Sequence, residues 1–233
     1  SIAVETGSSG LRDGISFGGA KSNLASAAGP ITGNNGQAFG TGSEPAVKDA
    51  FSFGIQLQAT KQLGKKHTLG LSAGYALLQT SMNVGRRVDS AMLSNSFAGS
   101  SYSAYFYTTT DSTPYINKYH FLRLGADLHT PFRLFKTIAF QWQLGAGINI
   151  LAATNGLHYD PVAKKLFSNN SLYAKTQSYI STGIDLSIGK QPFLYIGPHW
   201  QYSFTNLTGK PGGNQHLFLS SVKVSFVLPK KKK

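Results

Sequence analysis

Residues 138–150 read IAFQWQLGAGINI, and their side chains alternate between two kinds. One set is large and apolar, as at Phe140 and Trp142, and the other is polar or very small, as at Gln141 and Gln143. A period of two predicts a β-strand, because successive side chains of a strand point to opposite sides of the sheet. A soluble sheet would bury the tryptophan face, whereas a membrane barrel would turn that face to lipid and enclose the glutamines. The fold therefore depends on which face points inward.

Seven other segments repeat this alternation. They lie at residues 1–8, 50–60, 68–80, 120–130, 178–189, 193–203 and 218–228. Several reach the roughly 9 to 11 residues that a tilted strand needs to cross a bilayer. The connections alternate in length, with short links after the second, fourth and sixth segments and long links at 9–49, 83–118, 152–177 and 204–215. Short periplasmic turns and longer extracellular loops are typical of outer-membrane barrels.

The composition narrows the class of protein. Only 13% of the 233 residues are charged, 26 are glycine and none is cysteine, whereas about a quarter of residues carry charge in typical soluble domains. The lack of cysteine excludes disulfides and thiolate metal sites. No run of about 20 apolar residues is present, which excludes a transmembrane helix but not a barrel. Residues 1–10 lack the basic and apolar parts of a signal peptide, so we expect that a signal was removed or that a longer precursor exists.

The second face of the strands is polar, which favours lipid on the outside. Soluble strands average roughly five or six residues, and their solvent faces tend to carry Lys and Glu, whereas this face is rich in Gly, Ser and Gln. A soluble sandwich is the alternative. Because side chains just fill the interior of an eight-stranded barrel, we predict a buried charge network; a proton or ion path is the alternative. The network is predicted to contain Glu5, Arg123, Asp127, Asp185, His199 and Lys223.

Two further sets of residues fit the strands and connections of the predicted barrel. Aromatic girdles at the membrane interfaces are predicted from Phe51, Tyr119, Trp200, Tyr202 and Phe226. The short turns and the tail at 229–233 carry basic residues and no acidic one. This predicted periplasmic rim contains Lys61, Lys65, Lys66, Arg133, Lys136, Lys190, Lys230 and Lys231. Such a rim would attract anionic lipid headgroups and accounts for much of the net charge of +13 without nucleic acid; an ordinary solvated rim is the alternative.

Four stretches carry a resemblance to a known group. NKYHFLRLGADLHTPF, LGAGINILAA, FLYIGPHWQYSFTNLT and HLFLSSVKVSFVLPKKKK resemble the small outer-membrane β-barrels of Bacteroidota, the PorT-like group. The resemblance covers residues 115–228 and extends to the first half mainly by rhythm. It implies a barrel that stands alone, serves in a secretion or assembly complex, or ends a longer envelope-spanning signalling protein.

The sequence offers little sign of catalysis. A lipid-modifying enzyme would need a serine, a histidine and an acid brought together, and the candidate histidines are His120, His158, His199 and His216. No His, Asp or Glu spacing resembles a metal site, and the glycine-rich GISFGGAKS lacks the context of a phosphate loop. The tyrosine-rich segment 100–119 predicts either a binding surface or a hairpin that extends two barrel strands. Ser90 and Ser112 resemble O-glycosylation acceptors of Bacteroidota.

Together these features predict an all-β protein with one domain over residues 1–233. It is an eight-stranded antiparallel up-and-down transmembrane β-barrel of the bacterial outer membrane, with short periplasmic turns, four longer extracellular loops and a basic periplasmic tail at 229–233. We expect a non-enzymatic interaction protein without cofactors or metals, whose partners are outer-membrane lipids, other envelope proteins or surface ligands, and not nucleic acid. The alternatives are the outer-membrane module of a signalling protein and a lipid-modifying enzyme.

Overall fold

Eight long strands form a closed barrel. The computed structural model describes residues 1–13, 45–64, 66–89, 105–109, 113–133, 139–160, 164–188, 194–208 and 215–228. The barrel strands are β1 (Ile2–Asp13), β2 (Lys48–Leu63), β3 (His67–Val84), β6 (Thr113–Arg133), β7 (Ala139–Thr154), β10 (Thr176–Ile188), β11 (Leu194–Ser203) and β12 (Gln215–Phe226). Their order is β1-β12-β11-β10-β7-β6-β3-β2, and every pairing is antiparallel. The predicted eight-stranded up-and-down barrel is confirmed.

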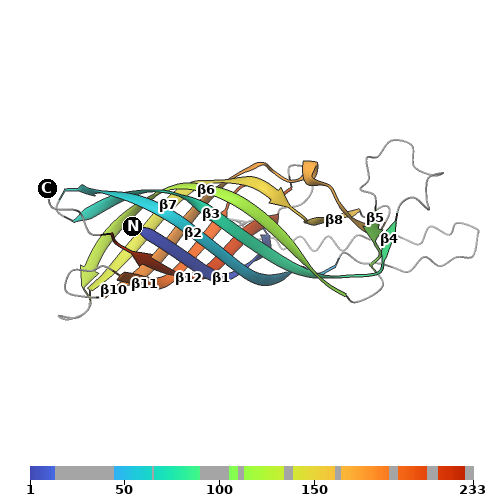
Figure 1. Cartoon of the computed structure of the whole chain (residues 1–233), viewed down its shortest axis with the longest axis horizontal. Helices are drawn as coiled ribbons and strands as arrows, with labels where there is room; N and C mark the ends of the chain where they lie inside the picture. Colours follow the sequence, from blue (N-terminus) through green and yellow to red (C-terminus); the bar gives the residue numbers. More distant parts are fainter. Residues whose placement is uncertain are drawn as a thin grey trace, which may run out of the picture.

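A second, smaller sheet lies beyond one end of the barrel (Figure 1). It contains β4 (Arg87–Asp89), β5 (Tyr105–Tyr107), β9 (Lys165–Ser168) and β8 (Leu157–Asp160), in that order across the sheet. We call it the outer sheet. The long connections predicted at residues 83–118 and 152–177 therefore contain short strands that the alternation did not indicate. The short 3-10 helix η2 (Asn170–Leu172) follows β9. Within the described ranges, no helix is long and apolar enough to span a membrane.

Two barrel strands extend toward the outer sheet. β3 and β6 pair without interruption from Thr68↔His129 to Val84↔Thr113. Of the two interpretations of the tyrosine-rich segment, extension of barrel strands is therefore confirmed for residues 113–119. At 21 residues, β6 is about twice as long as a membrane crossing requires. Its additional residues therefore extend beyond the membrane toward the outer sheet.

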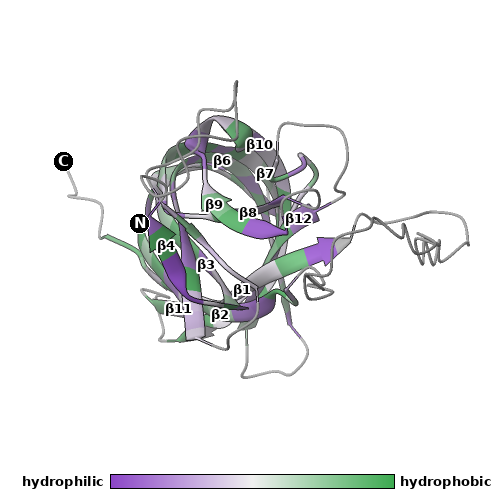
Figure 2. Cartoon of the chain, turned by 90° about the vertical axis from the view of Figure 1, so that its right-hand side faces the viewer, coloured by the Kyte–Doolittle hydropathy of each residue, from purple (hydrophilic) through white to green (hydrophobic). Residues whose placement is uncertain are grey.

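The barrel wall is apolar outside and polar inside. Leu57 and Leu71 have exposed fractions of 63% and 60%, values that would be costly for large apolar side chains in water. Seen end-on, the strands form a ring in which apolar and polar residues alternate (Figure 2). Apolar side chains project outward from strand after strand, including Ile55, Leu71, Leu124, Leu144, Ile184, Trp200 and Val222. The soluble sandwich is therefore wrong, because the eight long strands close into one barrel that leaves this apolar face exposed.

One predicted girdle residue faces the wrong way. Tyr119 is only 2% exposed and packs inside the barrel. A register shift between His120 and Phe121 occurs next to it in the β6–β7 pairing. The alternation continues at this point with its polarity reversed, since Lys118 is exposed and Phe121 is buried, so the apolar face did not mark the lipid side. Phe51, Trp200 and Phe226 do lie exposed on the wall.

The connections orient the barrel in a bacterial outer membrane. Short links join β2 to β3, β6 to β7 and β10 to β11, at the end where Ile2 pairs with Phe226. Long links and the outer sheet lie at the opposite end. In barrels of this type, short turns face the periplasm and long loops face the exterior. The outer sheet is therefore on the extracellular side.

Candidate functional site

The lumen gathers charged side chains from five strands. Each of the six predicted luminal residues is buried, with an exposed fraction of 8% or less. Glu5 comes from β1, Arg123 and Asp127 from β6, and the rest from β10, β11 and β12. Alternation explains their common direction, since the neighbours of each along its strand point to lipid. The six do not form one continuous chain of contacts, and they divide into three groups.

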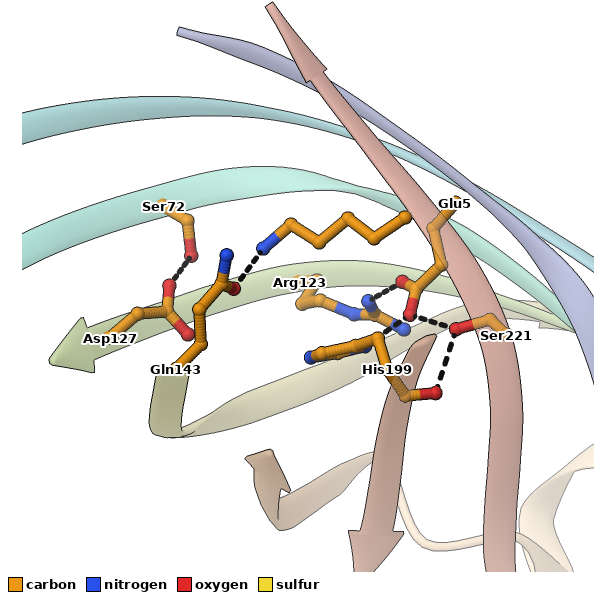
Figure 3. Close-up of polar contacts among 8 residues, drawn as sticks. Glu5, Ser72, Arg123, Asp127, Gln143, His199 and Ser221 are labelled. Atoms are coloured by element: carbon orange, nitrogen blue, oxygen red, sulfur yellow. Dashed lines mark hydrogen bonds and ion pairs between the residues drawn. The ribbon is translucent and has the colours of Figure 1, made fainter. Parts of the chain in front are cut away.

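The first group surrounds the Glu5 carboxylate (Figure 3). Arg123 Nη1 donates to Oε2 at 2.7 Å, and Ser221 Oγ donates to Oε1 at 2.6 Å. His199 Nδ1 lies 2.5 Å from the same Oε1. Charge-assisted hydrogen bonds of this length are among the strong ones in proteins. One carboxylate thus holds together side chains from four strands.

The second group links charges through neutral side chains. Gln143 accepts from Lys223 Nζ at 2.9 Å and donates to Asp185. Asp127 forms a third group, in which it accepts from Ser72 Oγ at 3.3 Å, apart from the Glu5 group in Figure 3. Sequence reasoning did not single out Ser72 and Ser221 as partners, although both stand on the polar face of the alternation. Serine is too frequent in this chain for a single position to be recognised.

A tyrosine fills the lumen beside these charges because two glycines make room for it. Gly125 and Gly147 are paired across β6 and β7. A Cβ atom at these positions would lie 2.5 Å and 2.6 Å, respectively, from Tyr179 Oη. The Tyr179 ring centroid lies 5.7 Å from the Arg123 guanidinium, within reach of a cation–π contact. The small residues of the polar face thus admit large side chains from across the barrel.

Toward the extracellular end, the lumen is filled by apolar side chains instead. We call this buried cluster the apolar tier, and it contains Ala76, Leu78, Tyr119, Phe121, Tyr173, Leu207, Leu217 and Leu219. Tyr173 and Leu207 come from outside the barrel strands, and Ala174 N donates to Leu207 O at 3.0 Å. The rings of Tyr119 and Tyr173 meet at 5.8 Å. Two connecting segments therefore fold back into the barrel and close its outer half.

The outer sheet carries a row of aromatic rings. The Arg87 guanidinium lies 3.9 Å from the Tyr105 ring centroid. Tyr105 and Tyr107 are 5.9 Å apart, and Tyr107 and Tyr115 are 5.5 Å apart. Tyr115 donates its hydroxyl to Asn155 O at 2.8 Å. Burial, together with the neighbouring Tyr107 and Tyr105, raises the pKa of Tyr115 to about 12, so its hydroxyl stays protonated as a donor. We call Tyr105, Tyr107 and Tyr115 the tyrosine row.

The tyrosine row is anchored on a small apolar core. Met82, Val84, Leu157 and Leu166 are buried together, and Tyr107 and Tyr115 pack against them. Met82 and Val84 belong to β3, whereas Leu157 and Leu166 belong to β8 and β9. The outer sheet is thus attached to the extended barrel strand by side-chain packing as well as by the chain itself. Such packing holds the rings in place.

The remaining predicted sites are placed only in part. Lys61, Lys66 and Arg133 are exposed near the short connections. Several predicted positions lie outside the described residues: Lys65, Lys136, Lys190, Lys230, Lys231, the rest of the tail 229–233, Ser90, Ser112 and GISFGGAKS.

The four candidate histidines lie in different places. His120 Nδ1 is 2.6 Å from Tyr75 Oη, and His158 packs edge-on against Phe167. His216 stacks on Tyr202. His199 shares Glu5 with Ser221, but the serine hydroxyl donates to the carboxylate and to the His199 backbone carbonyl, and not to the imidazole ring. That arrangement does not activate a serine as a nucleophile. Among the described residues, no group of three or more His, Asp or Glu side chains could hold a metal ion.

Comparisons with known proteins complete the description. No family model and no curated protein matches the chain. Among solved structures, the chain is similar to Neisserial surface protein A (NspA), with 10% identity over 97% of both chains and a TM-score of 0.37. It is also similar to Ail, the attachment invasion locus protein of Yersinia pestis, solved in complex with the heparin analogue sucrose octasulfate. That match has 10% identity over 97% of this chain and 95% of Ail, with a TM-score of 0.35. The closed eight-stranded wall, apolar outside and polar inside, makes the chain a small outer-membrane β-barrel.

Proposed function

We propose that the protein is a non-enzymatic barrel that presents the tyrosine row to an envelope protein or a surface ligand outside the cell. The observation that carries this proposal is the outer sheet itself, which extends the barrel beyond its membrane-spanning length. The lumen is filled by charged side chains and by the apolar tier, which argues against transport as its role. What the barrel offers instead is a rigid support for the extracellular sheet.

The chemistry of the tyrosine row suits binding. Tyr105 and Tyr107 are half-buried, so each ring keeps some free surface while its position is fixed. Tyrosine gives large contact area at low entropic cost and is enriched at binding surfaces. Arg86 and Arg87 are exposed beside the row. A partner with acidic or hydroxyl groups next to a flat apolar face fits this combination of rings and guanidinium groups.

Cross-linking in native membranes tests the proposal. The tagged protein is cross-linked in its own cells, purified, and its attached partners are identified, beside a Tyr105→Ala/Tyr107→Ala variant and a Lys61→Ala control at the opposite end of the barrel. We expect a reproducible partner that is retained by Lys61→Ala and lost by the tyrosine variant. Heat-modifiable gel migration checks that each variant still folds. A partner set that is the same for all three proteins contradicts the proposal.

The basic residues at the periplasmic end support a second contact. We infer that Lys61, Lys66 and Arg133, all exposed there, attract anionic headgroups of the inner leaflet, at about 1 kcal/mol per residue. Co-purified phospholipid should become less anionic in a Lys61→Gln/Lys66→Gln/Arg133→Gln variant. An unchanged lipid profile contradicts this contact.

Other hypotheses stay predictions. These are the membership of the Bacteroidota PorT-like group, the single domain over residues 1–233 and a place at the end of a signalling protein. The lipid-modifying enzyme is not favoured, because the candidate histidines lie in separate surroundings.

A further inference from the structure

A polar layer lies within the lumen, on three adjacent strands. Arg123 of β6 pairs across the sheet with Asn149 of β7, and Asn149 pairs with Gln177 of β10. All three face inward, with exposed fractions of 5%, 0% and 0%. Tyr173 and Leu217 of the apolar tier come from the segment just before β10 and from the outer half of β12. The polar layer therefore has the apolar tier on its extracellular side.

Several polar atoms of this layer have no hydrogen-bond partner in the part of the chain that the structure describes. Both amide atoms of Asn149 and both of Gln177 are in this state, as are Nε and Nη2 of Arg123. Gln201 Oε1 and Ser203 Oγ, on β11, are unpartnered as well. Ser203 pairs with Tyr179, the inward-facing residue that follows Gln177 on β10, which brings these atoms to the same side of the lumen.

Leaving so many buried polar atoms without hydrogen bonds would strongly lower the stability of the fold. Each unsatisfied buried donor or acceptor costs about 1 to 3 kcal/mol, so the set would exceed the marginal stability of a typical domain. Native proteins resolve such cases with bound water, which makes about three hydrogen bonds to otherwise unpaired polar groups. A carboxamide needs a ligand that accepts from its nitrogen and donates to its oxygen.

The charges of the lumen decide the class of ligand. Glu5, Asp127 and Asp185 bring three carboxylates, against two permanent cations in Arg123 and Lys223. An additional anion would increase this excess of negative charge. A cation would meet the unpartnered Nε and Nη2 donors of Arg123. A neutral molecule that both donates and accepts satisfies the amides and the guanidinium at once.

We propose that Arg123, Asn149 and Gln177, together with Gln201 and Ser203, form an enclosed hydration site that holds ordered water inside the barrel. Water there completes the hydrogen bonds of the two amides and connects them to the Arg123–Glu5 pair. The apolar tier lies between this water and the extracellular medium, and six of its eight side chains have no hydrogen-bonding group. The site is thus a structural part of the filled lumen and not a segment of a channel.

Nuclear magnetic resonance of the folded chain in detergent micelles tests the proposal. Nitrogen-edited rotating-frame spectra detect transfer between water and the side-chain amides of Asn149 and Gln177, which Asn149→Leu and Gln177→Leu variants assign. Asn149→Ser serves for assignment if the leucine variant does not fold. The matched control is Trp142 Nε1, which donates to Thr182 Oγ1 at 3.0 Å on the lipid-facing wall.

We expect water cross-peaks at both amides and none at Trp142. A direct cross-peak between the two amides without water transfer would overturn the proposal, because the side chains would then satisfy each other. Absence of water transfer at either amide would overturn it as well. So would a bound solute other than water, seen as its own resonance at these amides.

Discussion

The two halves of the lumen fill one barrel with opposite chemistry. The periplasmic half relies on specific pairs, such as Arg123 with Glu5. The extracellular half relies on apolar packing, with Leu207 and Tyr173 brought in from connecting segments. Apolar packing tolerates small changes of shape, whereas a buried charge depends on its partner. Single substitutions should therefore destabilise the charged periplasmic half strongly, whereas the apolar extracellular half should lose stability in smaller steps.

The largest effect is expected from breaking a pair in the charged half. Arg123→Met leaves the Glu5 carboxylate buried without its guanidinium, which should lower the free energy of unfolding by about 3 to 5 kcal/mol. Urea unfolding in lipid vesicles, followed by tryptophan fluorescence, measures this loss. The double variant Arg123→Met/Glu5→Gln should recover most of it. A double variant as unstable as the single one would show that the pair is not the cause.

A smaller effect is expected in the apolar half. Leu207→Ala removes a side chain that is 2% exposed and should cost about 2 to 4 kcal/mol through lost burial and the cavity left behind. The control Phe204→Ala, at an exposed position nearby, should change stability little. Conductance across planar bilayers should stay at background for Leu207→Ala, because the charged half still fills the lumen. Stable channels in this variant would show that the apolar tier alone closes the barrel.

A smaller loss of stability is expected from a substitution at Gly147, where the backbone lies close to Tyr179. Alanine at Gly147 would place its Cβ 2.2 Å from the Leu124 carbonyl oxygen and 2.6 Å from Tyr179 Oη. Overpacking of this kind costs about 1 to 3 kcal/mol. Ala146→Val, one residue away and facing lipid, is the matched control and should be nearly neutral. Equal loss in both variants would mean that strand geometry, and not luminal crowding, limits this site.

The smallest effect on stability is expected from the Arg12–Asp49 pair, which lies at the extracellular ends of β1 and β2. Hydrogen bonding to Arg12 lowers the pKa of Asp49, although burial opposes the shift. Because the pKa of Asp49 is lower in the folded state, the ionised carboxylate stabilises the fold above pH 3.8. This stabilisation is lost as the pH falls below 3.8 and the carboxylate is protonated. Because both side chains are more than a third exposed, the pair should contribute less than about 1 kcal/mol. The stability difference between wild type and Asp49→Asn should shrink steadily as the pH falls below 3.8; a difference that stays constant in acid argues against the pair.

The sequence indicated the wall and the charged half of the lumen because alternation is strong there. On β7, Trp142 and Leu144 are exposed and Gln143 is buried, as the pattern predicts. The apolar half was missed for a physical reason: the polarity of the alternation reverses near Tyr119, where Lys118 is exposed while Tyr119 and Phe121 are buried in the lumen. The insertion of Tyr173 and Leu207 depends on contacts between distant segments. Strands of three or four residues, such as β4 and β8, are too short to show any period.

The Glu5 carboxylate also bears on how the barrel is assembled. Its partners His199 and Ser221 lie 194 and 216 positions further along the chain, and β1 closes the barrel against β12. Contacts of such separation form late, since loop closure precedes them. Until β12 arrives, an ionised side chain on β1 has no complete set of partners, and entering lipid would be unfavourable. The full set of partners of this carboxylate exists only in the closed barrel, so its burial is linked to the pairing of the first strand with the last.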